Sequence, residues 1–149
     1  MNREIIVVGL SHRTAPVETR EQLAITTAEM AGAYKCLLEQ PNVEEGVILS
    51  TCNRVELIAV APNGDGRAEN AVSRLYDFLS SFHQYDLSPL RNHLYDLAGP
   101  AAIKHVFRVT SSLDSMVVGE PQITGQVKEA FQRAQDAAGV GHRLTRLMN

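Results

Sequence analysis

The sequence has few cysteines and no long apolar run. Its two cysteines, Cys36 and Cys52, make no disulfide framework in a chain without a secretory signal. No Cys/His spacing suggests a zinc site. No apolar stretch approaches the ~18 residues that span a membrane, and the N-terminus has no signal-peptide pattern. We therefore expect a cytoplasmic protein with no bound metal and no membrane contact.

An excess of positive charge is also absent. The net charge is −3 and the pI about 5.9, which argues against a broad electrostatic grip on nucleic acid. What the 149 residues do contain is an ordinary mixture, 44% apolar and 21% charged. That composition and length fit one soluble domain with a buried core.

The pattern of apolar residues predicts four strands. They are 4–10 (EIIVVGL), 46–50 (GVILS), 55–60 (VELIAV) and 93–97 (HLYDL). A helix follows the first strand and another follows the third, so the order is that of a split βαβ unit. This order predicts an α+β, ferredoxin-like βαββαβ fold, an antiparallel sheet with helices on one face.

Capping and breaking residues place the helices. Pro16 opens a short helix over 17–23, and Thr26 with Glu29 forms a capping box before the first long helix. The apolar face of that long helix is predicted to be Met30, Ala31, Tyr34, Leu37 and Leu38, and that of the second Ala68, Ala71, Val72, Leu75, Phe78, Leu79 and Phe82. Additional C-terminal helices should begin at Pro100, Pro121 and His142, the last of which looks unfinished at residue 149.

Cys52 is the first candidate for chemistry. It follows an apolar strand, in a connection where side chains reach solvent. Arg54 is two residues away and would favour the thiolate if both side chains point the same way. On these residues alone, Cys52 is either a nucleophile or a loop cysteine without a role. Cys36, inside a predicted helix, is expected to be a buried apolar group.

A catalytic thiol often works with an acid or a base, and His105 is one candidate among five histidines. A histidine beside Val106 and Phe107 in a helix is more often structural. The run 115–126 (SMVVGEPQITGQ) reads either as a helix start or as polar groups presented to a ligand. No glycine-rich phosphate loop follows a predicted strand, so the sequence predicts no dinucleotide-binding unit.

Three strings resemble the glutamyl-tRNA reductase family, in the family's order. They are GLSHRTAPVETRE (9–21), ILSTCNRVEL (48–57) and HVFRVTSSLDSMVVGEPQITGQVKEA (105–130). One small departure is Thr110-Ser111-Ser112, where the family pattern usually has Ala-Ser-Gly. The resemblance implies a ferredoxin-like fold, in agreement with the predicted element order.

The resemblance also implies roles for residues. Residues 1–149 would be the N-terminal catalytic, substrate-binding domain, with the NADPH-binding and dimerisation domains absent. Cys52 would be the nucleophile that attacks the ester between glutamate and tRNA, and His105 a second catalytic residue. The substrate contacts implied besides Cys52 are Thr51, Asn53, Arg54, Ser115, Glu120, Pro121, Gln122 and Gln126.

The implied activity is NADPH-dependent reduction of glutamyl-tRNA to glutamate-1-semialdehyde through a cysteine thioester, the first committed step of tetrapyrrole (porphyrin and haem) biosynthesis. NADPH would be bound by the missing domain, so this chain would supply acyl transfer alone and no reductase activity. The resemblance further implies a homodimer of the full-length protein and hand-over of the product to glutamate-1-semialdehyde aminomutase.

Two other classes of function compete with this enzyme. A ferredoxin-like RNA-binding module needs aromatic residues on its central strands, and the first three predicted strands have none. A module that binds a small regulatory molecule would leave Cys52 idle. A cysteine hydrolase would use the same thiol but pass the acyl group to water.

Overall fold

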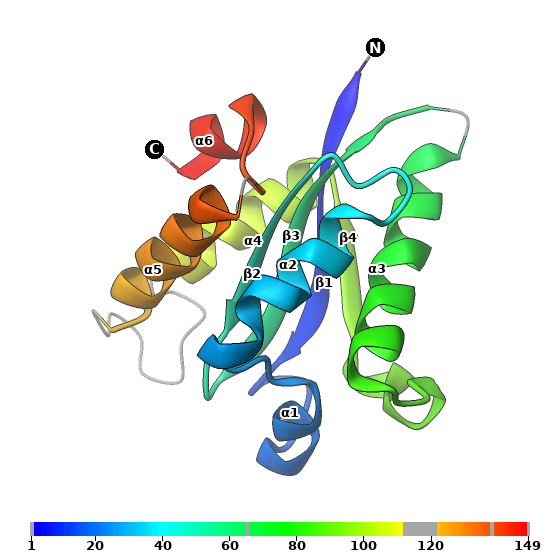
Figure 1. Ribbon diagram of the computed structural model, residues 1–149, viewed down its shortest axis with the longest axis vertical. Helices are drawn as coiled ribbons and strands as arrows, with labels where there is room; N and C mark the ends of the chain where they lie inside the picture. Colours follow the sequence, from blue (N-terminus) through cyan, green and yellow to red (C-terminus); the bar gives the residue numbers. More distant parts are fainter. Residues whose placement is uncertain (1, 65, 112–121, 138, 149) are drawn as a thin grey trace.

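A computed structural model describes residues 2–64, 66–111, 122–137 and 139–148 (Figure 1). Four strands form one sheet, β1 (Arg3–Ser11), β2 (Glu45–Ser50), β3 (Arg54–Pro62) and β4 (Tyr95–Ala98). Their order is β2-β3-β1-β4, and every neighbouring pair is antiparallel. This is the sheet that the split βαβ order predicts.

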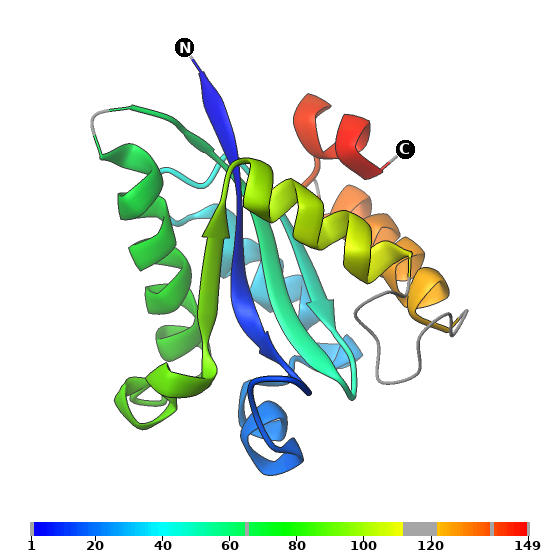
Figure 2. The ribbon, with the colours of Figure 1, turned by 180° about the vertical axis from the view of Figure 1, so that it is seen from behind.

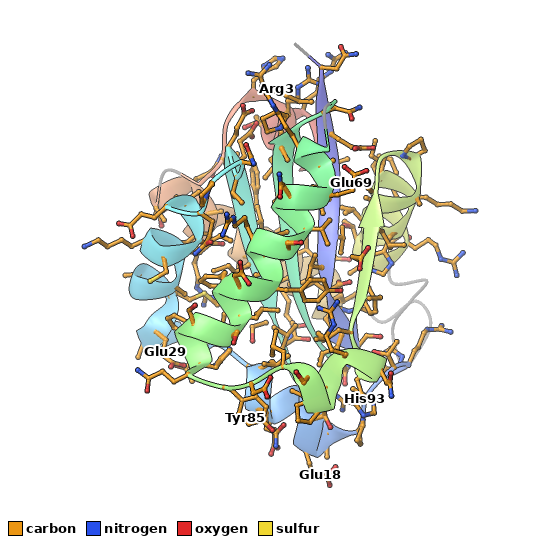
Figure 3. All side chains as sticks on the ribbon, turned by 90° about the vertical axis from the view of Figure 1, so that its right-hand side faces the viewer. Arg3, Glu18, Glu29, Glu69, Tyr85 and His93 are labelled. Carbon is orange, nitrogen blue, oxygen red and sulfur yellow. The ribbon has the colours of Figure 1, made fainter. Side chains whose placement is uncertain are left out.

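Two helices, α2 (Met30–Leu38) and α3 (Arg67–His83), cover one face of the sheet (Figure 1). A short helix, α1 (Val17–Leu23), lies at the end of the sheet where β1 ends, close to the 3₁₀ turns η1 (Thr27–Glu29) and η2 (Ser88–His93). The His93 ring nitrogen Nδ1 donates to the Thr14 carbonyl at 2.8 Å, which joins η2 to the segment before α1 (Figure 3).

The opposite face of the sheet is covered by the C-terminal helices (Figure 2). The first, α4 (Pro100–Thr110), crosses β1 and β4, and α5 (Gln122–Asp136) packs on β2. The last, α6 (His142–Met148), stands near the other end of the sheet, where β1 begins. The predicted ferredoxin-like fold with additional C-terminal helices is thus confirmed, and the sheet is a layer between two layers of helices.

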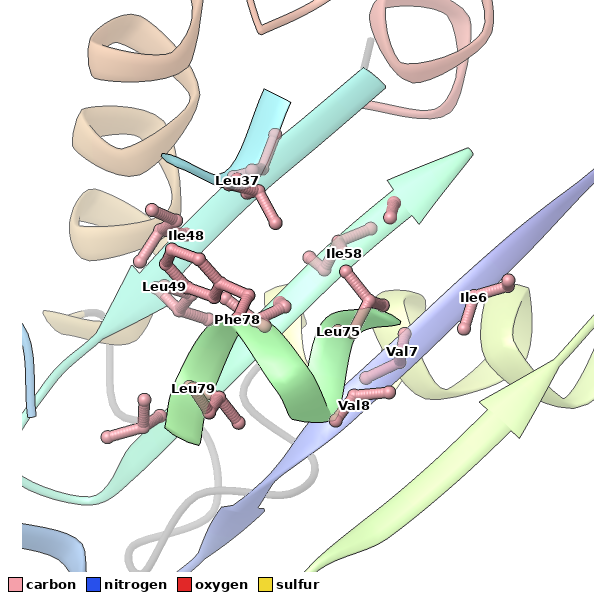
Figure 4. Packing of buried hydrophobic residues seen from close by; sticks show 14 of the residues in the cluster. Ile6, Val7, Val8, Leu37, Ile48, Leu49, Ile58, Leu75, Phe78 and Leu79 are labelled. Atoms are coloured by element: carbon pink, nitrogen blue, oxygen red, sulfur yellow. The ribbon is translucent and has the colours of Figure 1, made fainter. Parts of the chain in front are cut away.

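This layering explains the continuous apolar runs in β1 and β3. Side chains alternate between the two faces of a strand, and both faces are buried here. Ile6 and Val7, which point to opposite faces of β1, are both 0% exposed, as are Leu75 and Phe78 on α3 (Figure 4). A strand buried on both faces has no polar alternation.

The apolar face of α2 differs from the predicted one. Met30, Ala33, Tyr34 and Leu37 are buried, at helical spacing, whereas Ala31 is exposed and Leu38 only partly buried. Cys36 is exposed, so the prediction that it is a buried apolar group was wrong. Cys36 lies outside the arc of the helix that carries the four buried residues.

None of the helices in the part of the chain that the structure describes combines the length and hydropathy needed to cross a membrane.

Candidate active site

Cys52 lies in the short turn that joins β2 to β3. The turn is fixed from inside, because the Thr51 hydroxyl oxygen accepts the N–H groups of Asn53 and Arg54, both at 3.2 Å. The His12 N–H donates to the Asn53 carbonyl at 2.7 Å, which ties the turn to the end of β1. Cys52 itself is exposed. The sequence therefore folds into a rigid support that presents a thiol to solvent.

Arg20 of α1 holds the same turn from the other side. Its Nε donates to the Cys52 carbonyl at 3.1 Å, and its Nη1 donates to the Ala15 carbonyl at 2.7 Å. A cavity of about 370 Å³ lies between α1 and the turn, and its lining includes Arg20, Thr26, Ser50 and Cys52. Sequence reasoning gave Arg20 no role, although it stands inside the string 9–21 that carried the family resemblance.

Arg54 does not extend into solvent beside Cys52. It is the first residue of β3 and is 1% exposed. Its Nη1 donates to Glu56 Oε1 at 3.0 Å, in an ion pair that is buried on both sides. A buried charge needs such a partner, because leaving it unpaired is costly.

Glu56 is the centre of a buried cluster. Its Oε1 accepts from Arg54, and its Oε2 contacts both Tyr95 Oη, at 2.5 Å, and His105 Nε2. Burial by itself would raise the pKa of Glu56, but the hydrogen bond from His105, the positive charge of Arg54 and the hydrogen bond from Tyr95 together hold that pKa below its ordinary value. Glu56 is therefore a buried carboxylate.

Gly9 makes this cluster possible. It lies on β1 between Glu56 of β3 and Tyr95 of β4, paired with both. A Cβ atom at this position would stand 2.2 Å from the Val55 carbonyl oxygen and 2.8 Å from the Glu56 Cα. Gly9 has no side chain, and the Tyr95 hydroxyl crosses β1 at this position to reach Glu56. Burial and the negative charge of Glu56 raise the pKa of Tyr95, which therefore remains a donor.

His105 reaches the cluster from α4. Its side chain is 17% exposed, and its ring packs edge to face on Tyr95 with 5.6 Å between the ring centroids. Cys52 precedes β3 by two residues, and His105 contacts the third residue of that strand. The two predicted catalytic residues thus stand at the same end of β3. Neither Glu56 nor Tyr95 was singled out from the sequence.

The remaining predicted site residues belong to the run 115–126. Ser115, Glu120 and Pro121 lie outside the described residues. The backbone of Gln122 begins α5, and Gln126, one turn later, is half-buried. Within the described ranges, no group of three or more His, Cys, Asp or Glu residues is placed to hold a metal ion.

Comparisons with known proteins identify relatives of this chain. The sequence model of the family described as "Glutamyl-tRNAGlu reductase, N-terminal domain" matches residues 8–149. "Glutamyl-tRNA reductase" of Geotalea daltonii is 48% identical over 145 residues, which are 97% of this chain and 32% of that protein. The protein of the same name from Syntrophotalea carbinolica is 44% identical over 143 residues, 96% of this chain and 31% of that protein.

A solved structure is also similar. "Glutamyl-tRNA Reductase from Methanopyrus kandleri" superimposes with a TM-score of 0.77 at 30% identity, covering 97% of this chain and 31% of that one. The chain therefore spans about a third of the length of the relatives that it matches.

Proposed function

Because the chain belongs to the family of glutamyl-tRNA reductase N-terminal domains, we propose that it provides the site where the glutamyl group of glutamyl-tRNA passes to Cys52. The observation that carries this proposal is the exposed thiol on a fixed turn, beside a cavity of about 370 Å³. The buried Glu56 cluster supports it, because His105 contacts the third residue of β3, the strand that follows the Cys52 turn.

The proposed step is an acyl transfer. The Cys52 thiol gives up its proton, and its sulfur attacks the carbonyl carbon of the glutamyl ester. A C–S bond forms, the C–O bond to the terminal ribose of the tRNA breaks, and the ribose oxygen takes a proton. The result is a thioester on Cys52 and a free tRNA end. His105 is the proposed carrier of the proton from sulfur to the ribose oxygen.

Substrate recognition is proposed for residues on both sides of Cys52. Arg54 is the residue suited to a carboxylate of the glutamyl group, since its guanidinium presents five donors in a planar fork. Arg54 is 1% exposed in the folded chain, so this contact requires its guanidinium to become accessible when the substrate binds. The motif match supports Thr51, Asn53, Ser115, Glu120, Pro121, Gln122 and Gln126 as further contacts.

Reduction of the thioester to glutamate-1-semialdehyde is proposed for the whole enzyme, as the NADPH-dependent first committed step of tetrapyrrole synthesis. The described residues do not fit that cofactor. A dinucleotide site is built from parallel strands with a glycine-rich turn into a helix, whereas every neighbouring strand pair here is antiparallel. In this proposal NADPH is held outside the described residues. Dimer formation and hand-over of the aldehyde to an aminomutase belong to the same proposal for the whole enzyme.

The acyl transfer is tested by intact-mass spectrometry after mixing the chain with glutamyl-tRNA. We expect a glutamyl adduct on the wild type and on Cys36→Ser, and none on Cys52→Ser. Cys36 is a matched control, because both cysteines are exposed. An adduct that persists on Cys52→Ser would exclude Cys52 as the nucleophile. A wild type that forms no adduct would favour a regulatory binding module instead.

A further inference from the structure

The contacts of Glu56 determine where the proton on the His105 ring lies. We infer that Glu56 is a positioning residue that holds His105 with its proton on Nε2, so that Nδ1 is the atom that exchanges protons. The second half of this inference rests on the proposed acyl transfer. The first half concerns the folded chain alone.

The buried charge of Arg54 determines the ionisation state of Glu56. A guanidinium stays protonated in proteins and only donates hydrogen bonds. Arg54 is 1% exposed and its ion-pair partner Glu56 is equally buried. A buried cation of this kind is stable only beside an anion. Glu56 is therefore ionised, and an ionised carboxylate accepts hydrogen bonds and donates none.

The consequence for His105 follows from its contact atom. Because Glu56 Oε2 is an acceptor, the ring nitrogen in contact with it must donate, and that nitrogen is Nε2. In a neutral imidazole one nitrogen carries the proton and the other accepts. The proton on Nε2 thus leaves Nδ1 with a free lone pair, and no described residue is placed as a hydrogen-bond partner of Nδ1.

Tyr95 and Gly9 fix the oxygen that holds the ring. Tyr95 Oη donates to the same Oε2 at 2.5 Å, across Gly9 of β1, which pairs with both Glu56 and Tyr95. With Arg54 on Oε1, both carboxylate oxygens are held. A ring turned to place Nδ1 toward Glu56 would lose the contact between Nε2 and Oε2, so the ring has one favoured orientation.

The chemistry of acyl transfer then passes through Nδ1. This nitrogen accepts the proton from the Cys52 thiol and returns it to the ribose oxygen as the ester bond breaks. Nε2 keeps its proton and its contact with Glu56 throughout. Glu56 and Tyr95 act through His105 and are positioning residues.

The proton on His105 can be located by ¹⁵N NMR of the chain, at a pH where the imidazole is neutral. We expect Nε2 to resonate as a protonated nitrogen and Nδ1 as an unprotonated one. In Glu56→Gln the charge is gone and the amide can donate as well as accept, so we expect a mixture of tautomers. Tyr95→Phe, which keeps the Arg54–Glu56 pair, should give a smaller shift in the same direction.

Tyr76→Phe is the matched control. Tyr76 also donates to a carboxylate, Asp96 Oδ2 at 3.0 Å, but from α3 on the opposite face. Its loss should leave the His105 signals unchanged. A wild type with the proton on Nδ1 would overturn the inference, and so would wild-type signals in a folded Glu56→Gln.

Single-turnover acylation tests the role of Nδ1. We expect Glu56→Gln to slow it by ~10²-fold or more at saturating glutamyl-tRNA, the usual range of acid–base catalysis, with little change in the half-saturating concentration. Unchanged acylation in a Glu56→Gln variant with mixed tautomers would refute the catalytic half. A wild type that keeps the proton on Nε2 but forms no adduct would refute the proposed function and leave the tautomer assignment standing.

Discussion

Single residues at this site were visible in the sequence to different degrees. Cys52 was found because its neighbours are polar and follow an apolar strand. Gly9 interrupts an apolar strand, a pattern that signals a close approach of another group, and Glu56 is a charge within the apolar run VELIAV. The sequence did not reveal the partners of Gly9 and Glu56. They become neighbours of Tyr95 only because β1 pairs with both β3 and β4.

At this scale we predict that Arg20 supports acylation of Cys52. Arg20→Gln loses the charged donor to the Cys52 carbonyl, and a hydrogen bond from a charged group is worth about 1.5–3 kcal/mol, less where solvent competes. We therefore expect acylation to slow by roughly tenfold, measured in single turnovers. Arg74→Gln, which removes an exposed ion pair with Asp77 on α3, is the control. Equal rates for the two variants would leave Arg20 without a role in holding the turn.

At the scale of elements, the strands were predicted better than the faces of the helices. Strands buried on both faces appear as unbroken apolar runs, so β1, β2 and β3 could be placed to within a residue or two. The face of α2 was misjudged at Ala31 and Cys36. Helical spacing allows adjacent faces when apolar residues are frequent, and only packing on the sheet selects one of them.

Two glycine-to-alanine substitutions are expected to change stability in opposite directions, because a Cβ has no room at Gly9 of β1 and has room at Gly32 of α2. Gly9→Ala places a methyl group 2.2 Å from the Val55 carbonyl oxygen, and overpacking of this kind costs about 1–3 kcal/mol, occasionally more. In Gly32→Ala, on α2, the new Cβ meets no atom within 4 Å, and helix propensity should raise stability by about 0.5–1 kcal/mol. Urea unfolding of both variants measures the effects. A Gly9→Ala protein as stable as the wild type would show that β1 and β3 can shift apart at this position without cost.

At the scale of the whole molecule, the C-terminal helices are part of the same core. The Gly46 N–H of β2 donates to the Gly139 carbonyl at 2.7 Å. The Glu45 carboxylate accepts from the backbone of Gly141 at 2.6 Å and of Leu144 at 3.0 Å, at the start of α6. These contacts join residues almost a hundred positions apart. The sequence predicted the helices but not this attachment, because nothing local to Glu45 reveals its partners.

Hydride transfer has a structural requirement that the described sheet does not meet. A nicotinamide cofactor must be held and oriented near the thioester for hydride transfer, and the usual holder presents a helix N-terminus after a parallel strand. The described strands are all antiparallel to their neighbours. We therefore expect calorimetry to detect weak NADPH binding or none by this chain, with the threefold longer Geotalea daltonii relative titrated alongside it for comparison.

Analysis of the reaction products distinguishes acyl transfer to Cys52 from reduction of the thioester. With the thioester formed and no hydride donor positioned, water is the remaining acceptor of the acyl group. Chromatography after incubation with glutamyl-tRNA and NADPH should show slow release of glutamate from the wild type and none above background from Cys52→Ser. Glutamate-1-semialdehyde among the products, or tight NADPH binding, would mean that this chain itself carries a cofactor site that the antiparallel sheet gives no reason to expect.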